Sequence, residues 1–101
     1  MDDHRILIRD ALVEVVHGAA LKAQESGFLP SGPLPEINLE QPQKSENGDY
    51  ASSLPMKLAR SARKNPIQIA ERLVQLFPDV GGVGEVWVAP PGFINFRLSP
   101  K

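Results

Sequence analysis

Residues 93–98 read Phe-Ile-Asn-Phe-Arg-Leu, and this alternation of side chains sets the architecture expected for the chain. Successive side chains of a strand point to opposite faces, so the apolar residues at positions 94, 96 and 98 share one face. The opposite face then carries an aromatic ring, an amide and a guanidinium, which belong to Phe93, Asn95 and Arg97. We therefore expect a strand with one buried face and one face open to solvent or to a partner.

A second strand is expected just before it, over residues 85–89, where residues that favour strands predominate. Two turns bound this strand, Gly81-Gly82-Val83-Gly84 before it and Pro90-Pro91-Gly92 after it. The glycine-rich segment superficially resembles a phosphate-binding loop. It lacks the following Lys-Ser/Thr pair and leads into a strand, so we interpret it as a turn.

Three helices are predicted from apolar residues that recur at helical spacing. The first covers about residues 3–24. The second begins near residues 52–53 with Pro55 in its first turn, and the third begins at Asn65-Pro66, with Asn65 as the N-cap. The buried positions expected on these helices are Ile8, Leu12, Val15, Val16, Ala19, Ala23, Leu54, Leu58, Ala62, Ile69, Ala70, Leu73, Val74 and Phe77.

The segment between the first two helices is expected to form a hairpin. Residues 30–35 are too rich in proline and glycine to hold a helix. Residues 36–40 alternate between polar and apolar side chains, which predicts a short half-buried strand. Asn47-Gly48 is a typical hairpin turn pair, and residues 49–52 follow it as the returning strand.

This order of elements predicts a single α+β domain over residues 1–101. A helix, two strands, a helical pair and two strands give the order α-β-β-α-β-β, a two-layer sandwich in which a mainly antiparallel four-stranded sheet packs against helices. The 101 residues, with 42% hydrophobic and 23% charged side chains, are typical of one small globular domain.

Catalysis and metal binding by this chain alone are not expected. The chain has no cysteine, and its two histidines, His4 and His17, are off any usual metal-ligand spacing. Asp49 and Tyr50 are adjacent but have no accompanying base or nucleophile.

No apolar run approaches the roughly 20 residues of a membrane span, and the start Met-Asp-Asp-His lacks the basic region of a secretory signal. We expect a cytoplasmic protein with no membrane partner.

The charge distribution favours a polyanionic partner for the second half of the chain. Residues 1–50 carry nine acidic and four basic side chains, a net charge of −5, whereas residues 51–101 carry three acidic and seven basic side chains, a net charge of +4. Lys57, Arg60 and Lys64 fall at helical spacing, with Arg63 nearby. A solvated helix face is the alternative explanation for this basic cluster.

The polar face of residues 93–98 suits recognition of an unstacked nucleotide. A ring can stack on the base, an amide can bond the base edge and a cation can contact the phosphate, roles that fit Phe93, Asn95 and Arg97. The alternative from the residues alone is an edge strand with mixed surface residues, in which the ring lies under a loop.

Three segments together resemble the N-terminal additional domain of arginyl-tRNA synthetases. They are Asn47-Gly48-Asp49-Tyr50-Ala51, then Lys64-Asn65-Pro66 with Ile69-Ala70, and finally Pro91-Gly92-Phe93-Ile94-Asn95-Phe96. They occur in the order and spacing of that family, the last is the most specific, and the resemblance covers essentially the whole chain. The expected α-β-β-α-β-β order is similar to the family's fold.

The resemblance implies binding to the D-loop at the outer corner of tRNA(Arg). In the family, the aromatic and amide side chains of the last segment contact a D-loop nucleotide, commonly the adenosine at tRNA position 20. Carried over, stacking falls on Phe93 and base-edge hydrogen bonds on Asn95. Gly48, Asp49 and Tyr50 match the family's Gly-Asp-Tyr turn, for which a structural role is expected. Charge and spacing add phosphate contacts at Arg97, Lys57, Arg60 and Lys64.

The same resemblance implies that residues 1–101 are a fragment of a larger enzyme. The class I signatures His-x-Gly-His and Lys-Met-Ser-Lys-Ser are absent, as is an ATP-binding loop, so ligation of arginine with ATP and Mg would belong to the rest of the parent. Pro55 and the doubled Pro90-Pro91 depart from the family's usual pattern. The alternatives are a structural or protein-interaction domain without nucleic-acid contact, and a small standalone enzyme.

Overall fold

The computed structural model describes residues 4–99, with side chains from residue 8 onward. The order of its helices and strands is α-β-β-α-α-β-β, with the expected helical pair as two separate helices. The elements are α1 (His4–Glu25), β1 (Leu39–Glu40), a short 3-10 turn η1 (Ser45–Asn47), β2 (Tyr50–Ser52), α2 (Leu54–Ala62), α3 (Pro66–Gln75), β3 (Val83–Ala89) and β4 (Phe93–Leu98).

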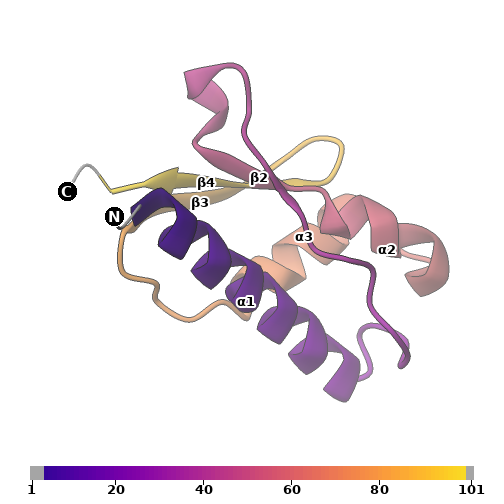
Figure 1. Cartoon of the computed structure of the whole chain (residues 1–101). Helices are drawn as coiled ribbons and strands as arrows, with labels where there is room; N and C mark the ends of the chain where they lie inside the picture. The colour runs from indigo at the N-terminus through magenta and orange to yellow at the C-terminus, as the bar shows by residue number, and fades with distance from the viewer. Residues whose placement is uncertain (1–3, 100–101) are drawn as a thin grey trace.

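The four strands form one antiparallel sheet in the order β1-β2-β4-β3. The helices pack on one face of it, and Figure 1 shows α1 running along that side. The loop of residues 41–49 rises from the sheet on the side away from α1 (Figure 1). The α+β sandwich expected from the sequence is therefore confirmed, and the second face of the sheet is free of helices.

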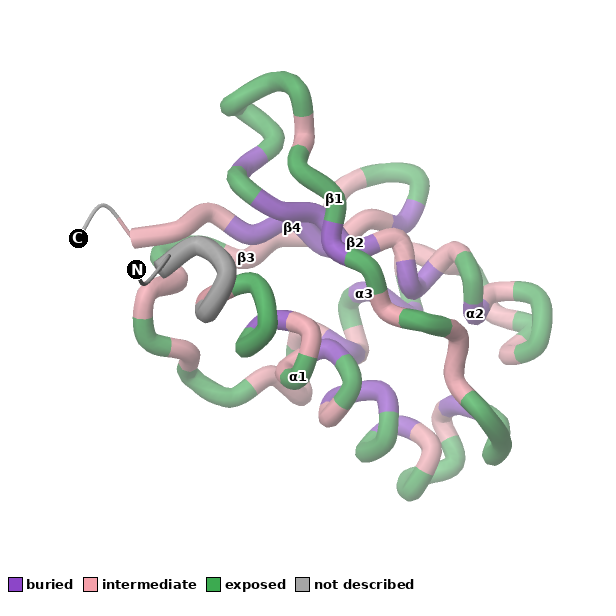
Figure 2. The backbone as a smooth tube through the Cα atoms, viewed as in Figure 1, coloured by how far each residue is buried: buried purple, intermediate pink, exposed green. Residues whose placement is uncertain are grey.

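β4 lies in the centre of this sheet and supplies the middle of the core. Its bounds are those predicted, and its apolar face is buried at Ile94 and Phe96, both 0% exposed. Phe96 is opposite Tyr50 on β2 and Val86 on β3, and its ring stacks on that of Phe77 with 5.9 Å between the centroids. Figure 2 shows that buried residues gather on β2, on β4 and on the inner side of α1.

The helices follow their predicted apolar stripes with small shifts at the ends. On α1, Leu12, Val16, Ala19 and Ala23 are buried as expected, whereas Ile8 and Val15 are half-buried. α2 begins at Leu54 with Pro55 in its first turn. α3 has the predicted cap, since the Asn65 Oδ1 accepts a 2.8 Å hydrogen bond from the Ile67 amide. It ends at Gln75, so Phe77 lies in the turn after the helix and still reaches the core.

The predicted tight hairpin at Asn47-Gly48 is wrong. Asn47 is the last residue of the 3-10 turn, and a nine-residue loop, 41–49, joins β1 to β2. Gly48 has φ +91° and ψ −168°, which does not fit a two-residue hairpin turn. The preference of the Asn-Gly pair is overridden because the Asp49 amide donates a 2.7 Å hydrogen bond to the Phe96 carbonyl of β4, which draws the loop onto the sheet. The first strand is also shorter than predicted and begins at Leu39 rather than residue 36.

Candidate nucleic-acid interface

A pocket of about 420 Å³ lies on the face of the sheet that the helices leave free. Phe93 and Asn95 of β4 contribute to it, together with Ala51 of β2 and Ala89 of β3. Cross-strand pairing sets this arrangement, since residues opposite one another in an antiparallel sheet present their side chains to the same face. Its remaining lining comes from Glu40, Pro42, Gln43, Lys44, Asn47 and Pro90.

The sequence correctly predicts that Phe93 and Asn95 share a face, but Asn95 is more enclosed than expected. Its side chain lies opposite Ala51 on one side and Trp87 on the other, and the residue is 4% exposed. The 41–49 loop passes over this region, and a side chain at Gly48 would lie 3.0 Å from the Trp87 ring. Burial of Asn95 therefore arises from a loop and a neighbouring strand, which the alternation of β4 cannot reveal.

The side-chain amide oxygen of Asn95, Oδ1, is buried without a hydrogen-bond partner among the described residues. A buried polar atom without a partner costs about 1–3 kcal/mol of stability, so such atoms are uncommon in folded proteins. This one lies beside the half-buried ring of Phe93 in the same pocket. An unpaired acceptor next to an aromatic face is suited to a planar ligand that carries hydrogen-bond donors.

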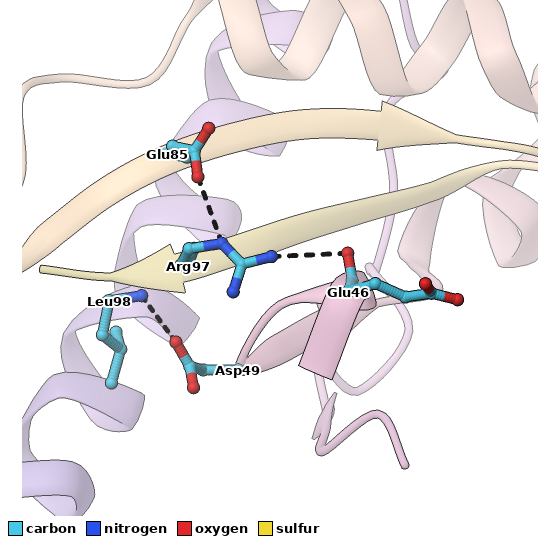
Figure 3. A network of polar contacts seen from close by, with 5 residues as sticks. All are labelled: Glu46, Asp49, Glu85, Arg97 and Leu98. Carbon is cyan, nitrogen blue, oxygen red and sulfur yellow. Dashed lines mark hydrogen bonds and ion pairs between the residues drawn. The ribbon is translucent and has the colours of Figure 1, made fainter. Parts of the chain in front are cut away.

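Arg97 lies further along the same face, and the structure engages its guanidinium within the protein (Figure 3). Nε donates to Glu85 Oε1 at 3.1 Å, and Nη2 donates to the Glu46 carbonyl at 3.4 Å. The guanidinium also lies over the Trp87 ring, 5.5 Å from its centre. Arg97, for which the sequence predicts a phosphate contact, therefore already has an anionic partner within the protein.

The Gly48-Asp49-Tyr50 segment joins the 41–49 loop to the sheet. The Asp49 Oδ2 accepts a 2.8 Å hydrogen bond from the Leu98 amide, as Figure 3 shows, while its own amide donates to the Phe96 carbonyl. Tyr50 is 3% exposed and lies opposite Phe96 in the sheet. These contacts attach the end of the loop to β4.

The basic side chains predicted for the second helix do not line the pocket that contains Phe93 and Asn95, and Lys64 lies outside α2, which ends at Ala62 because Arg63 adopts a left-handed conformation. Arg60 is exposed, whereas the Lys57 amino group lies 3.5 Å from the Glu36 carbonyl, and that of Lys64 lies 4.9 Å from the centre of the Phe28 ring. The start of the helix instead lies against the turn that precedes β4. A side chain at Gly92, the residue before Phe93, would meet Met56 Cγ at 3.0 Å.

Sequence reasoning missed the contribution of the 41–49 loop to the pocket. Lys44 and Asn47 line it from the loop, whereas the sequence predicts only a hairpin turn at Asn47-Gly48 and no role for Lys44 in a site. Trp87, which lies over the Asn95 region and under Arg97, was also not singled out. The available signal was the run of polar residues 43–49, which is longer than a two-residue turn requires.

The described residues hold no cluster of three or more His, Asp or Glu side chains that could bind a metal ion. His17 is exposed on α1, and the side chain of His4 lies outside the described residues. None of the helices described is long and apolar enough to cross a membrane.

Fold and pocket together define a small α+β domain with an open sheet face. Comparison with known proteins places it more narrowly: residues 5–98 match the family described as the arginyl tRNA synthetase N terminal domain, and the chain belongs to that family.

Similar proteins support this assignment. The chain is 39% identical over 96 residues to an arginine–tRNA ligase of Dehalococcoides mccartyi strain CBDB1, covering 95% of the chain and 17% of the ligase. It is 46% identical over 86 residues to that of Syntrophotalea carbinolica, covering 83% of the chain and 16% of the ligase. The chain therefore spans about a sixth of the length of these relatives.

Solved structures agree on the fold. The arginyl-tRNA synthetase of Thermus thermophilus superposes with a TM-score of 0.69 at 31% identity, covering 90% of this chain and 14% of that one. The synthetase from Plasmodium falciparum gives a TM-score of 0.74 at 16% identity, covering 91% of this chain and 16% of that one. The predicted resemblance to the arginyl-tRNA synthetase family is confirmed.

Proposed function

We propose that this domain binds tRNA(Arg) as part of an arginine–tRNA ligase, by taking one unstacked D-loop nucleotide into the pocket beside β4. The observation that carries the proposal is the buried, unpaired side-chain oxygen of Asn95, a residue that lines the same pocket as Phe93. The proposal assigns ligation of arginine with ATP and Mg²⁺ to the remainder of such a ligase. It also places the protein in the cytoplasm, where tRNA serves protein synthesis.

Each of the two side chains has a distinct role in this proposal. The Phe93 ring supplies a flat apolar surface on which a base stacks, an interaction that every base can make. The Asn95 amide reads the base edge, and its carbonyl oxygen accepts a hydrogen bond from an exocyclic amino group such as that of adenine. The terminal torsion of asparagine has a broad energy minimum, so a modest rotation presents the amide to the pocket opening.

Phosphate contacts are also proposed for the basic cluster formed by Lys57 and Arg60 on α2 and by Lys64 just after its end. Arg60 is exposed, and neither Lys57 nor Lys64 has an ion-pair partner among the described side chains. Such contacts add affinity that is independent of base identity and falls as salt rises. They would guide the RNA backbone past the pocket.

A second surface favours contact with another part of the ligase. Leu21, on the outer side of α1, is 42% exposed. It lies in an apolar groove with Val13, Leu34 and Ile37. This groove is separate from the sheet face that carries Phe93, so the protein-interaction alternative and RNA binding are compatible. We propose the remainder of the synthetase as the partner for this groove.

Replacing Phe93 with Ala is expected to weaken tRNA(Arg) binding by about five-fold or more, because base–aromatic stacking contributes about 1–3 kcal/mol per base. Equilibrium titration of the chain with labelled tRNA(Arg) at low salt measures the effect. Leu21→Ala, which shortens an exposed apolar side chain on α1, is the control and should leave binding unchanged.

The same titration identifies the nucleotide when it is repeated with tRNAs that lack a single D-loop base. Loss of the contacted base should weaken binding to the unmodified chain but have little further effect on Phe93→Ala, since each change removes the same stacking interaction. Equal additional losses in both proteins would remove Phe93 from the D-loop contact.

Replacing Asn95 with Ala is expected to weaken tRNA binding about three- to ten-fold, because a net hydrogen bond contributes about 0.5–1.5 kcal/mol. The free energy of unfolding should stay constant or rise by up to about 1 kcal/mol, since the variant removes a buried acceptor without a partner. Urea unfolding and tRNA titration of one preparation measure both effects. A stability loss above about 1 kcal/mol would instead assign Asn95 to the packing of the sheet.

A further inference from the structure

We propose that the 41–49 loop forms one side of the nucleotide pocket and contacts the bound nucleotide. In this proposal Lys44 contacts the phosphate, and Arg97 holds the loop in place. This inference rests on the proposed function and specifies how the pocket is completed. It assigns a role to two loop side chains, and it changes the role of Arg97 from an RNA contact to a positioning residue.

The position of the loop supports the first part. Pro42, Gln43, Lys44 and Asn47 all line the pocket that contains Phe93 and Asn95, so nearly half of its lining comes from this loop. The strands supply the aromatic ring and the amide, but the loop supplies the cationic side chain of this pocket. A nucleotide stacked on Phe93 would therefore lie between the sheet and the loop.

Lys44 has the chemistry that a nucleotide phosphate requires. Its residue is exposed, and no ion pair within 4.0 Å joins it to a carboxylate among the described side chains. Glu40 also lines the pocket, and its carboxylate disfavours a phosphate on the β1 side. A phosphate would consequently be favoured at the end of the pocket where Lys44 lies.

The contacts of Arg97 support a positioning role (Figure 3). Its Nε is bonded to Glu85 on β3, and its Nη2 reaches the Glu46 carbonyl in the loop, 51 residues earlier in the chain. The guanidinium carbon also lies 5.5 Å from the centre of the Trp87 ring, a cation–π contact that favours this position. Glu85 also places a carboxylate beside this group, which would repel a phosphate that approached Arg97 directly.

Asp49 provides a second, independent anchor at the end of the loop. Its side chain and its amide both bond the backbone of β4, at Leu98 and Phe96. The 3-10 turn between Lys44 and Gly48 is thus attached to the sheet at Glu46 and at Asp49. Two attachments within four residues keep Lys44 and Asn47 facing the pocket.

The test of Lys44 compares two variants with the same change in charge. Lys44→Gln should weaken tRNA(Arg) binding about three- to ten-fold and lower the slope of log K against log salt concentration by about 0.7–0.9. Lys22→Gln, at an exposed position on α1, should change neither quantity. Equal behaviour of the two variants would overturn the assignment of Lys44.

The test of Arg97 uses Arg97→Lys and Arg97→Gln. A lysine cannot span from Glu85 to the Glu46 carbonyl as the guanidinium fork does, so both variants should weaken binding by a similar factor of about two to five with nearly the same salt slope as the unmodified chain. Amide hydrogen exchange at Asn47 and Gly48, whose amides are bonded within the loop, should accelerate in both. Normal affinity in Arg97→Lys, with a reduced salt slope in Arg97→Gln, would make Arg97 a direct phosphate contact and overturn the proposal.

Phe93→Ala, measured beside these variants, distinguishes failure of the proposed loop role from failure of the proposed function. If it weakens binding while Lys44→Gln and the Arg97 variants do not, the role of the loop is wrong and the nucleotide pocket remains. If Phe93→Ala also leaves binding unchanged, the proposed function itself fails.

Discussion

Phe96→Ala is expected to lower the free energy of unfolding by about 3–5 kcal/mol, the range for truncation of a buried phenylalanine. Phe96 is 0% exposed at the centre of β4, and the substitution would leave a cavity between the sheet and the helices. The ring of Phe77 would lose its stacking partner, and Tyr50 and Val86 would lose their cross-strand neighbour. Urea unfolding followed by far-ultraviolet circular dichroism measures the loss.

Phe93→Ala is the matched control for this prediction. It deletes the same atoms from the same strand, but Phe93 lies on the open face and is half-buried, so the loss of stability should be clearly smaller. Because a domain of this size has a total stability of about 5–15 kcal/mol, the Phe96 variant should unfold at much lower denaturant concentration. Equal losses for both variants would mean that the two faces of β4 are buried alike.

Gly48→Ala is expected to lower the free energy of unfolding by about 3 kcal/mol or more. The backbone at Gly48 has φ +91° and ψ −168°, a region that is essentially restricted to glycine and costs other residues about 1–3 kcal/mol. An added Cβ would also lie 2.6 Å from the Phe96 carbonyl oxygen and 3.0 Å from the Trp87 ring. The carbonyl oxygen belongs to the central strand and accepts the Asp49 amide, so it cannot move away cheaply.

Gly18→Ala provides a control of opposite sign. Gly18 lies within α1, and a Cβ there would have no heavy atom within 4 Å. Replacing a helical glycine with alanine stabilises a protein by about 0.5–1 kcal/mol, because the unfolded chain loses conformational freedom. Thermal unfolding of the two variants should therefore shift the midpoint in opposite directions. A midpoint for Gly48→Ala close to that of the unmodified chain would show that the loop relaxes around the added methyl group.

Much of the fold could be predicted because its helices and strands follow from short-range patterns in the sequence. The alternation of residues 93–98 predicted the bounds of β4, and the Asn65-Pro66 pair predicted the start of α3. The apolar spacing of α1 predicted its buried side, from Leu12 to Ala23. These features depend on neighbours within one or two turns or strands, where side-chain periodicity and backbone preference act directly.

The candidate site was only partly accessible to such reasoning. Alternation placed Phe93, Asn95 and Arg97 on one face, which the structure confirms through the pairing of β4 with β3. It did not predict that Asn95 is buried, that Arg97 is bonded to Glu85, or that Lys44 lies by the same pocket. The Asn-Gly pair also predicted a tight hairpin that the fold replaces with a longer loop.

There is a physical reason why the sequence predicted some features and only the tertiary structure decided others. Periodic patterns in the chain were sufficient to predict the helices, the central strands and which face of each is buried. Burial of an apolar stripe requires no particular partner, so the local pattern determines it. The partners of polar groups were decided by folding, since they come from distant segments: Arg97 meets the Glu46 carbonyl across 51 residues, and Asp49 meets Leu98 across 49. Hydrogen bonds depend on direction and distance, so the pocket and its loop exist only once the sheet has brought those segments together.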